Sequence, residues 1–185
     1  MTYPTIGHDR KDMTQEKEVW KIIKEFPNYD VSNFGNIANK HSDNILEPST
    51  TKQGALKIGL VKNGKQLTRS VKVIVAETFV KGQNEIFNTP ILLDGNQLNC
   101  HALNILWRPR WYAWNYSFQF NDIPDFYFDG PVLELNCDGI IMLAYNNVYE
   151  AAVKNGLLFH EVWKSIHTKK EVFPTKQFFT LPNKV

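Results

Sequence analysis

Tight turns interrupt this chain at short intervals, and they limit the length of any strand or helix between them. Asparagine accounts for 18 of the 185 residues, and a short polar residue precedes glycine at Asn63-Gly64 and Asp138-Gly139. Such pairs adopt the left-handed backbone that two-residue hairpin loops require. Apolar and β-branched segments flank both pairs, at 55–61 and 66–71 and at 132–135 and 140–143. The sequence therefore predicts two β-hairpins within a chain of short elements.

Helices are predicted between these turns. Apolar residues recur at helical spacing over 71–79, and an aromatic-rich segment over 110–120 is also compatible with a helix. Near the C-terminus, Asn147 can cap a helix over 148–154, and a second helix spans 159–167. The residues of this last helix at core spacing are Phe159, Val162, Trp163 and Ile166. Two short helices joined by a glycine-containing turn form a minimal helix-turn-helix, so we predict an α+β fold of small modules in series.

The composition is typical of a chain that folds in water, with 43% apolar and 22% charged residues. The apolar runs fall short of a bilayer span, and charged residues occupy positions 9–12, where a signal peptide would be apolar. Cys100 and Cys137 are too few for a disulfide framework or a four-thiolate zinc site. We therefore expect a soluble intracellular protein with no membrane partner and no small-molecule substrate.

The net charge of +2 is small for a nucleic-acid-binding protein, but the charge is unevenly distributed. Residues 40–75 carry seven basic and two acidic side chains, whereas residues 81–130 carry three basic and five acidic ones. A lysine-rich hairpin is compatible with an ordinary solvated surface and with phosphate binding. The charge pattern alone leaves both interpretations open.

A motif in the first half of the chain distinguishes between them. Residues 29–35 read Tyr-x-Val-Ser-Asn-x-Gly, after Trp20-x-x-Ile23 and before Val75-Ala76-x-x-Phe79. With these features, residues 18–80 resemble the nuclease-associated modular domain of phage and intron-encoded HNH homing endonucleases. Residues 91–107 resemble the HNH segment of the same family, through Asp94-Gly95-Asn96 and Asn104-x-x-Trp107.

The last 50 or so residues resemble the small C-terminal repeat that these enzymes use to grip DNA. The resemblance and the turn signals together imply five regions. They are a lead-in over 1–17, the modular domain over 18–80, a degenerate HNH-like hairpin and helix over 81–120, a proline-containing linker over 121–131, and a DNA-binding repeat over 132–185.

The resemblance implies that an HNH site hydrolyses a phosphodiester with one magnesium or manganese ion and a histidine as general base. Counted from Asp94-Gly95, the general-base position is Leu92, and the metal-ligand positions are Ile91 and Ala113. None of these side chains has a donor atom. What remains matches the HNH scaffold: Asp94, Gly95, Asn96, Asn99, Asn104 and Trp107. The resemblance therefore implies a nuclease fold without its catalytic residues, and without a cofactor unless activity survives.

An alternative hypothesis is that the chain is an active nuclease. A shift in register could bring His101, Asp94 and Asn115 together as displaced catalytic groups, and magnesium or manganese would then be required. That shift would break the match of the scaffold. Zinc is not expected, because the cysteines and His160 and His167 lack paired ligand spacing.

If the resemblance holds, basic side chains contact the phosphates of double-stranded DNA. The expected DNA-binding residues are Lys52, Lys57, Lys62, Arg69, Lys72, Arg108, Arg110, Asn147, His160, Lys164, His167, Lys169 and Lys170. Asn147 can serve instead as a helix cap, and the tryptophans and tyrosines over 111–116 are expected to fill the core.

Three hypotheses follow. The first is a sequence-selective DNA-binding protein that has lost catalysis, such as a phage regulator in the host cytoplasm. The second is an active nicking endonuclease with displaced groups. The third is a protein-interaction module of a phage complex or virion, which would bind a phage or host protein and no DNA.

Overall fold

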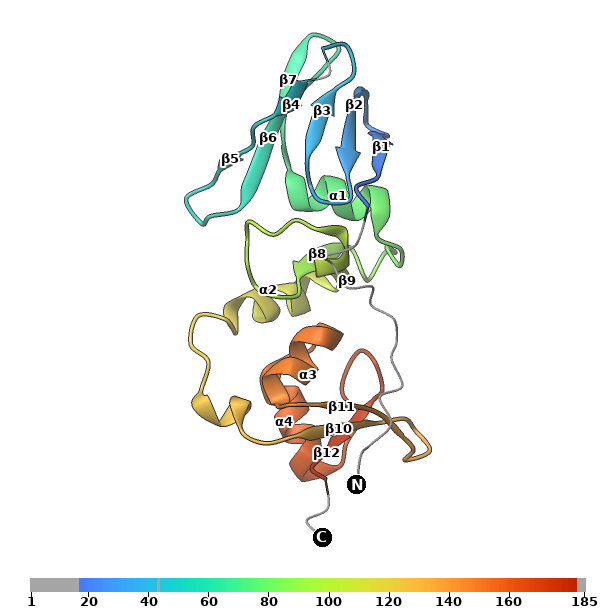
Figure 1. Cartoon of the computed structure of the whole chain (residues 1–185), viewed down its shortest axis with the longest axis vertical. Coiled ribbons are helices and arrows are strands. Elements are labelled where there is room, and N and C mark those ends of the chain that lie inside the picture. The colour runs from blue at the N-terminus through green and yellow to red at the C-terminus, as the bar shows by residue number, and fades with distance from the viewer. Residues whose placement is uncertain (1–16, 43, 183–185) are drawn as a thin grey trace. The chain divides into compact units, whose positions relative to one another are not determined.

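The computed structural model describes residues 17–42 and 44–182, and they form two compact units. The N-terminal unit extends to Ala113, and the C-terminal unit begins at Trp114, within helix α2 (Arg110–Phe118). Both units mix short helices with small antiparallel sheets (Figure 1). The predicted α+β class is confirmed.

Two small sheets and one helix form the first part of the N-terminal unit. The four-stranded sheet has the order β1-β2-β3-β4, and the three-stranded sheet has the order β5-β6-β7. The strands are β1 (Trp20–Ile23), β2 (Phe26–Ser32), β3 (Ile37–Asn39), β4 (Asn44–Leu46), β5 (Ser49–Thr50), β6 (Leu56–Lys62) and β7 (Lys65–Ser70). Helix α1 (Val71–Phe79) packs against both sheets (Figure 1).

The first predicted hairpin is present and is closed by the expected turn. Lys62 pairs with Lys65 across the loop, and both loop residues have positive φ, 52° at Asn63 and 73° at Gly64. Positive φ at both positions is the geometry of a type I′ turn, which matches the twist of the flanking strands.

A second hairpin completes the N-terminal unit. β8 (Thr89–Leu92) pairs with β9 (Ile105–Arg108), and the loop between them ends in a 3-10 turn over Ala102–Asn104. Leu92, Cys100, Ile105 and Trp107 lie in the same hydrophobic core as the residues of the two sheets and α1. Segments 18–80 and 81–113 therefore share one core.

The C-terminal unit places two helices against one sheet. The sheet has the order β11-β10-β12, with β10 (Val132–Leu135), β11 (Ile141–Tyr145) and β12 (Phe178–Thr180). Helices α3 (Val148–Asn155) and α4 (Phe159–Thr168) are joined by Gly156, whose φ of 62° ends α3 in the left-handed conformation. Residues 121–131, for which we predict a linker, contain a 3-10 turn over Asp125–Phe128 and contribute Tyr127 to the core.

Within the described ranges, no helix combines the length and the apolar character that crossing a membrane demands.

Candidate nucleic-acid interface

The loop of the β8–β9 hairpin is held by a network of asparagine and aspartate side chains. The Asn104 amide donates to Asp94 Oδ1 (2.8 Å) and to the Asn99 carbonyl (2.9 Å), and its Oδ1 accepts the Asp94 N–H (3.1 Å). The Asn99 amide donates to the other oxygen of Asp94 (2.7 Å). Asp94 also accepts the Asn96 N–H (2.9 Å). The structure thus joins four of the six scaffold residues predicted from the sequence, and Trp107 lies nearby in the core.

This loop is attached to the motif at residues 29–35. The Ala102 N–H donates to the Asn33 carbonyl (2.8 Å), and the His101 ring stacks on Phe34 with centroids 4.9 Å apart. The Gly35 backbone, with φ of 91°, lies so close to Cys100 that a Cβ there would be 3.1 Å from the Cys100 Cβ. The segment with the Tyr-x-Val-Ser-Asn-x-Gly pattern therefore packs directly against the hairpin loop.

The three positions expected to carry catalysis are apolar and buried. Ile91 is 0% exposed, Leu92 is 3% exposed and Ala113 is 6% exposed. Leu92 packs into the core of the N-terminal unit. Their side chains offer no atom that could take a proton or bind a divalent cation, so they do not fit the magnesium or manganese ion of an HNH site.

The three residues of the alternative catalytic site, His101, Asp94 and Asn115, do not all belong to one unit. His101 Nδ1 accepts the Leu103 N–H (3.1 Å) and caps the 3-10 turn, and Asp94 is occupied by the asparagine network. Asn115 belongs to the C-terminal unit, whereas the other two belong to the N-terminal unit. Among the residues that the structure describes, no group of three or more His, Cys, Asp and Glu side chains could hold a metal ion.

Cys100, buried in this loop, and the half-buried Lys72 on α1 influence each other's titration. Burial raises the pKa of the Cys100 thiol to about 11, although the Lys72 ammonium opposes the shift. Burial also lowers the pKa of Lys72. Lys72 is therefore partly withdrawn from the surface, in contrast to its predicted role at phosphate.

The other basic residues predicted in this region differ in their exposure and in their partners. Lys52 and Lys62 are exposed, and Lys57 is half-buried on β6. Arg69 forms a double hydrogen bond with Glu25, and its guanidinium lies 5.7 Å from the Phe26 ring centroid. The hydrogen bond from Arg69 lowers the pKa of Glu25. Arg69 therefore has a carboxylate partner already, and the lysines remain the candidates for phosphate.

The outward face of the three-stranded sheet carries polar side chains together with the exposed Val61, and the charge pattern of the sequence does not reveal this face. Lys57, Gln66 and Thr68 alternate with the buried Ile58 and Leu60 across the paired strands. Gly59 leaves room for the Gln66 side chain, since a Cβ there would be 2.2 Å from the Gln66 amide nitrogen. The strand register set by Asn63-Gly64 is the sequence signal that would have placed these residues together.

Two arginines after β9 differ in exposure. Arg108 is 8% exposed, donates to the Trp107 carbonyl (3.0 Å), and has its guanidinium 5.9 Å from the Tyr112 ring centroid. Arg110 is exposed at the start of α2. Of this predicted pair, Arg110 alone is at the surface. The aromatic residues that follow divide in the same way: Tyr112 and Tyr116 are buried as expected, but Trp111 and Trp114 are exposed.

One face of α4 is exposed and carries the predicted basic residues of the helix-turn-helix. His160, Lys164 and His167 lie on it, and Lys169 and Lys170 follow its end. Trp163 also lies on this face and is 42% exposed, with its ring against Phe126 and His167, so its predicted place in the core is wrong. Ser165 takes the inward position because its hydroxyl donates to the Lys170 carbonyl (2.6 Å) and accepts the Phe179 N–H (3.0 Å).

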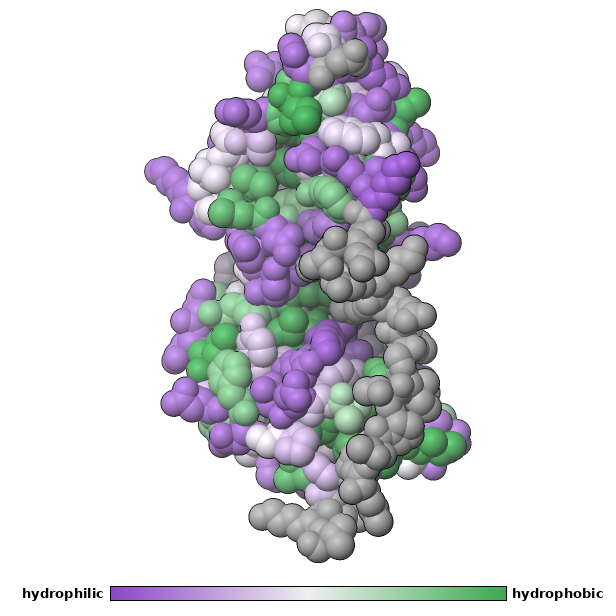
Figure 2. All heavy atoms as spheres, viewed as in Figure 1, coloured by the Kyte–Doolittle hydropathy of each residue, from purple (hydrophilic) through white to green (hydrophobic). Residues whose placement is uncertain are grey.

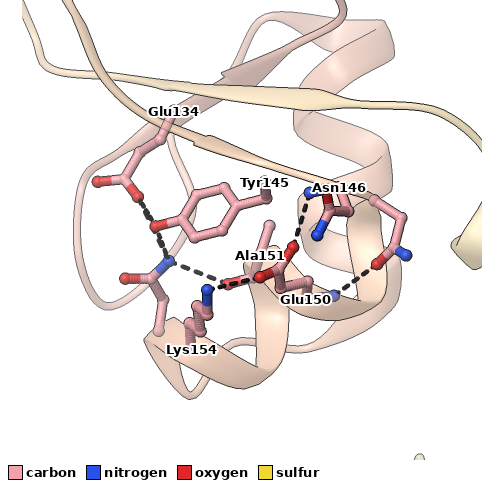
Figure 3. A network of polar contacts seen from close by, with 8 residues as sticks. Glu134, Tyr145, Asn146, Glu150, Ala151 and Lys154 are labelled. Atoms are coloured by element: carbon pink, nitrogen blue, oxygen red, sulfur yellow. Dashed lines mark hydrogen bonds and ion pairs between the residues drawn. The ribbon is translucent and has the colours of Figure 1, made fainter. Parts of the chain in front are cut away.

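A buried polar network fixes these helices to the sheet. Glu134 on β10 accepts hydrogen bonds from Tyr145 and Asn155, and the Asn155 amide also donates to the Ala151 carbonyl (Figure 3). Glu134 also accepts a hydrogen bond from Gln177.

Asn147 caps α3, because its Oδ1 accepts the Glu150 N–H (2.8 Å), and Glu150 in turn accepts the Asn146 N–H (2.7 Å) and pairs with Lys154 (Figure 3). The sequence favours the cap over a phosphate contact for Asn147, and the structure provides the cap.

Comparisons with known proteins show similarity to HNH endonucleases. The NUMOD4 motif model matches residues 18–66. An uncharacterized HNH endonuclease of Acanthamoeba polyphaga mimivirus, L245, is 38% identical over 88 residues, which are 48% of this chain and 26% of that protein. The DNA endonuclease I-HmuI of Bacillus phage SP01 is 36% identical over 89 residues, 48% of this chain and 51% of that protein. Over about half of its length, the chain is similar in sequence to these HNH endonucleases.

A solved structure of the HNH homing endonuclease I-HmuI, described for DNA binding and cleavage, extends the match to the fold. The two structures superpose with a TM-score of 0.51 and 24% identity over 90% of this chain and 99% of that chain. At this level of identity the likeness concerns the fold. The segments matched in sequence mean that the chain spans about a quarter to a half of the length of these curated HNH endonuclease relatives.

Proposed function

We propose that this relative of the HNH homing endonucleases binds double-stranded DNA sequence-selectively, inside the cell, without cleaving it. The observation that carries the proposal is the contrast within the β8–β9 hairpin. The hydrogen-bonded scaffold around Asp94 and Asn104 is complete, whereas Ile91, Leu92 and Ala113 are buried and apolar. A hairpin that keeps its shape but has no proton acceptor and no metal ligand at these positions supports DNA binding over DNA cleavage.

Contacts to phosphate and contacts to bases come from different residues. In the N-terminal unit, Lys52, Lys57 and Lys62 supply positive charge, and Gln66 and Thr68 on the outward sheet face supply groups that hydrogen-bond base edges. In the C-terminal unit, the exposed face of α4 carries His160, Lys164 and His167. A helix or a two-stranded ribbon fits the major groove, so both surfaces have the dimensions needed for reading sequence.

Two measurements on the full chain test the proposal. A gel-shift assay against duplexes selected from random DNA should yield a bound sequence class, with affinity that falls steeply as salt rises. Supercoiled plasmid incubated with the chain and Mg²⁺ or Mn²⁺ should stay supercoiled. Nicked plasmid would replace the proposal with the nicking endonuclease. Absence of any shift at low salt would replace it with the protein-interaction module.

The role of α4 is tested by reversing charge at its C-terminal end. The double variant K164E/K169E should bind the selected duplex about tenfold more weakly or worse, because two phosphate contacts are lost and two repulsions are added. K176E changes one lysine of the same unit outside α4, in the turn before β12, and should bind nearly as well as the unchanged chain. A loss of binding free energy in K176E about half that in the double variant, in proportion to the charge changed, would mean that total charge, not α4, governs binding.

A further inference from the structure

The C-terminal unit contains an open pocket that shares one residue, His160, with the proposed duplex-binding face of α4. Its volume is about 520 Å³, within the range of small-molecule sites. It lies between the end of α2 and the start of α4, and the residues lining it all belong to the C-terminal unit.

One wall of the pocket is aromatic and exposed. Trp114 and Phe118, one turn apart on α2, are 71% and 63% exposed, and their rings are stacked with centroids 6.3 Å apart and planes 21° from parallel. Exposed apolar residues are not confined to this wall: on the face of the molecule that Figure 2 draws, hydrophobic residues (green) lie among hydrophilic ones (purple). Rings of this size that fill no core present flat faces on which another planar ring can stack.

The opposite wall is held in place by the α3–α4 turn. The Gln119 side chain accepts the Phe159 N–H (2.8 Å) and donates to the Leu157 carbonyl (3.4 Å). Because both functional atoms of Gln119 are occupied, it fixes the distance between α2 and the beginning of α4. The aromatic wall therefore faces a preformed surface.

The rim of the pocket is polar but contains no lysine or arginine. Asn115 and Asn121 offer amides, Asp122 offers a carboxylate, and His160 offers an imidazole. A carboxylate without a lysine or arginine beside it in the lining opposes a phosphate group. Amide and carboxylate oxygens accept hydrogen bonds from the exocyclic amines of cytosine or adenine. The charge and the donor set together fit the edge of a neutral nucleobase.

We propose that this pocket receives one unpaired base of DNA, stacked on Trp114 and held at its edge by Asp122 and the neighbouring asparagines. The inference rests on the proposed DNA-binding function and adds a second mode to it: contact with a base outside the duplex stack. Cytosine, adenine and guanine, which carry exocyclic amines, are the preferred occupants, and thymine, which carries none, is disfavoured.

The pocket is tested with single-stranded oligo(dC) and oligo(dT), measured by fluorescence anisotropy. The unchanged chain should bind oligo(dC) more tightly than oligo(dT). W114A should bind oligo(dC) about tenfold more weakly, as expected for the loss of one stacked base. The matched control is W111A, which removes a 61% exposed tryptophan of the same helix that does not line the pocket, and it should leave binding unchanged.

D122A gives an independent readout of base recognition. Because the substitution removes both the negative charge and the hydrogen-bond acceptor, it should strengthen binding to oligo(dT), and the preference for oligo(dC) should disappear. Equal binding of oligo(dC) by W114A and the unchanged chain would overturn the pocket proposal, as would a preference that survives in D122A. Binding of the selected duplex is measured in parallel. Duplex binding with no single-strand effect rejects only the pocket, and loss of both rejects DNA binding itself.

Discussion

Gly35 lies where the Tyr-x-Val-Ser-Asn-x-Gly motif meets the loop of the β8–β9 hairpin. Two features of the structure require a residue without a side chain at this position. Its φ of 91° is unfavourable for other residues, and a Cβ would lie 3.1 Å from the Cys100 Cβ and 3.4 Å from the Cys100 carbonyl oxygen. We expect G35A to lower the free energy of unfolding by about 2–3 kcal/mol, from backbone strain plus displacement of the loop. Urea denaturation followed by circular dichroism measures the change.

Gly54 separates these two causes. It has φ of 82°, but no atom lies within 4 Å of a Cβ built on it. G54A should therefore carry the strain alone, about 1 kcal/mol. Equal destabilisation by the two substitutions would show that the contact with Cys100 has no energetic role.

The two cysteines should react very differently with a thiol reagent. Cys137 is exposed at a hairpin turn, whereas Cys100 is 2% exposed and burial raises its pKa to about 11. At pH 8, Ellman's reagent should modify Cys137 rapidly and Cys100 only after unfolding, because the thiolate is the reactive form. In C137S the native chain should show no fast-reacting thiol. Rapid labelling of both cysteines in the native chain would contradict the burial of Cys100.

The same pKa has a consequence for stability. The folded chain keeps the Cys100 proton in the window from about pH 8.5 to pH 11, in which an unfolded chain loses it. Because the folded state then binds more protons than the unfolded state, stability should fall as the pH rises through that window.

The roles of individual residues could be predicted from the sequence where their hydrogen-bond partners lie only a few residues away. The cap at Asn147 and the loop contacts of Asn104 involve residues whose amides bond backbone or side chains a few positions away. Trp163 was predicted in the core because periodicity assigns the larger apolar residue inward. The hydrogen bonds of Ser165 to Lys170 and Phe179 reverse that choice, and the second of these partners lies 14 residues away.

At the scale of elements, α4 begins without a capping side chain of its own. Its N-cap residue is Leu158, and Gln119 accepts the Phe159 N–H in its place. Q119A should lower the free energy of unfolding of the C-terminal unit by about 1–2 kcal/mol, because it removes this bond and the one to Leu157. Q53A, at an exposed turn of the N-terminal unit, should change stability by less than about 0.5 kcal/mol. Tryptophan fluorescence during urea unfolding measures both, and a Q119A midpoint equal to that of the unchanged chain would contradict the cap.

Helices and hairpins were predictable because caps and Asn-Gly or Asp-Gly turns act within a few residues. Strands that depend on distant partners were not. β12 is three residues long and exists through its pairing with β10, more than forty residues earlier in the chain. The shared core of segments 18–80 and 81–113 has the same origin, since Leu92 and Trp107 complete a surface left open by α1 and the two sheets. Local sequence patterns do not indicate contacts between residues that are far apart in the chain.

At the scale of the whole molecule, the net charge of +2 conceals two basic groups in different units. The exposed lysines 52 and 62 and the half-buried Lys57 belong to the N-terminal unit, and lysines 164, 169 and 170 belong to the C-terminal unit. If each contacts one phosphate, the logarithm of the binding constant should fall with the logarithm of the salt concentration with a slope of about −5. A neutral patch would give a slope near zero, so the slope measures contacts that the total charge does not reveal.

The slope also tests whether both units engage one duplex. K57E/K62E and K164E/K169E each remove two lysines, and each should reduce the steepness of the slope by about two. If both units bind the same DNA molecule, the fourfold variant should lose the sum of the two effects, because each set of counterions is released independently. Filter binding over a series of salt concentrations gives all four slopes. A slope that changes in one double variant and not in the other would assign DNA binding to a single unit and leave the second free for another partner.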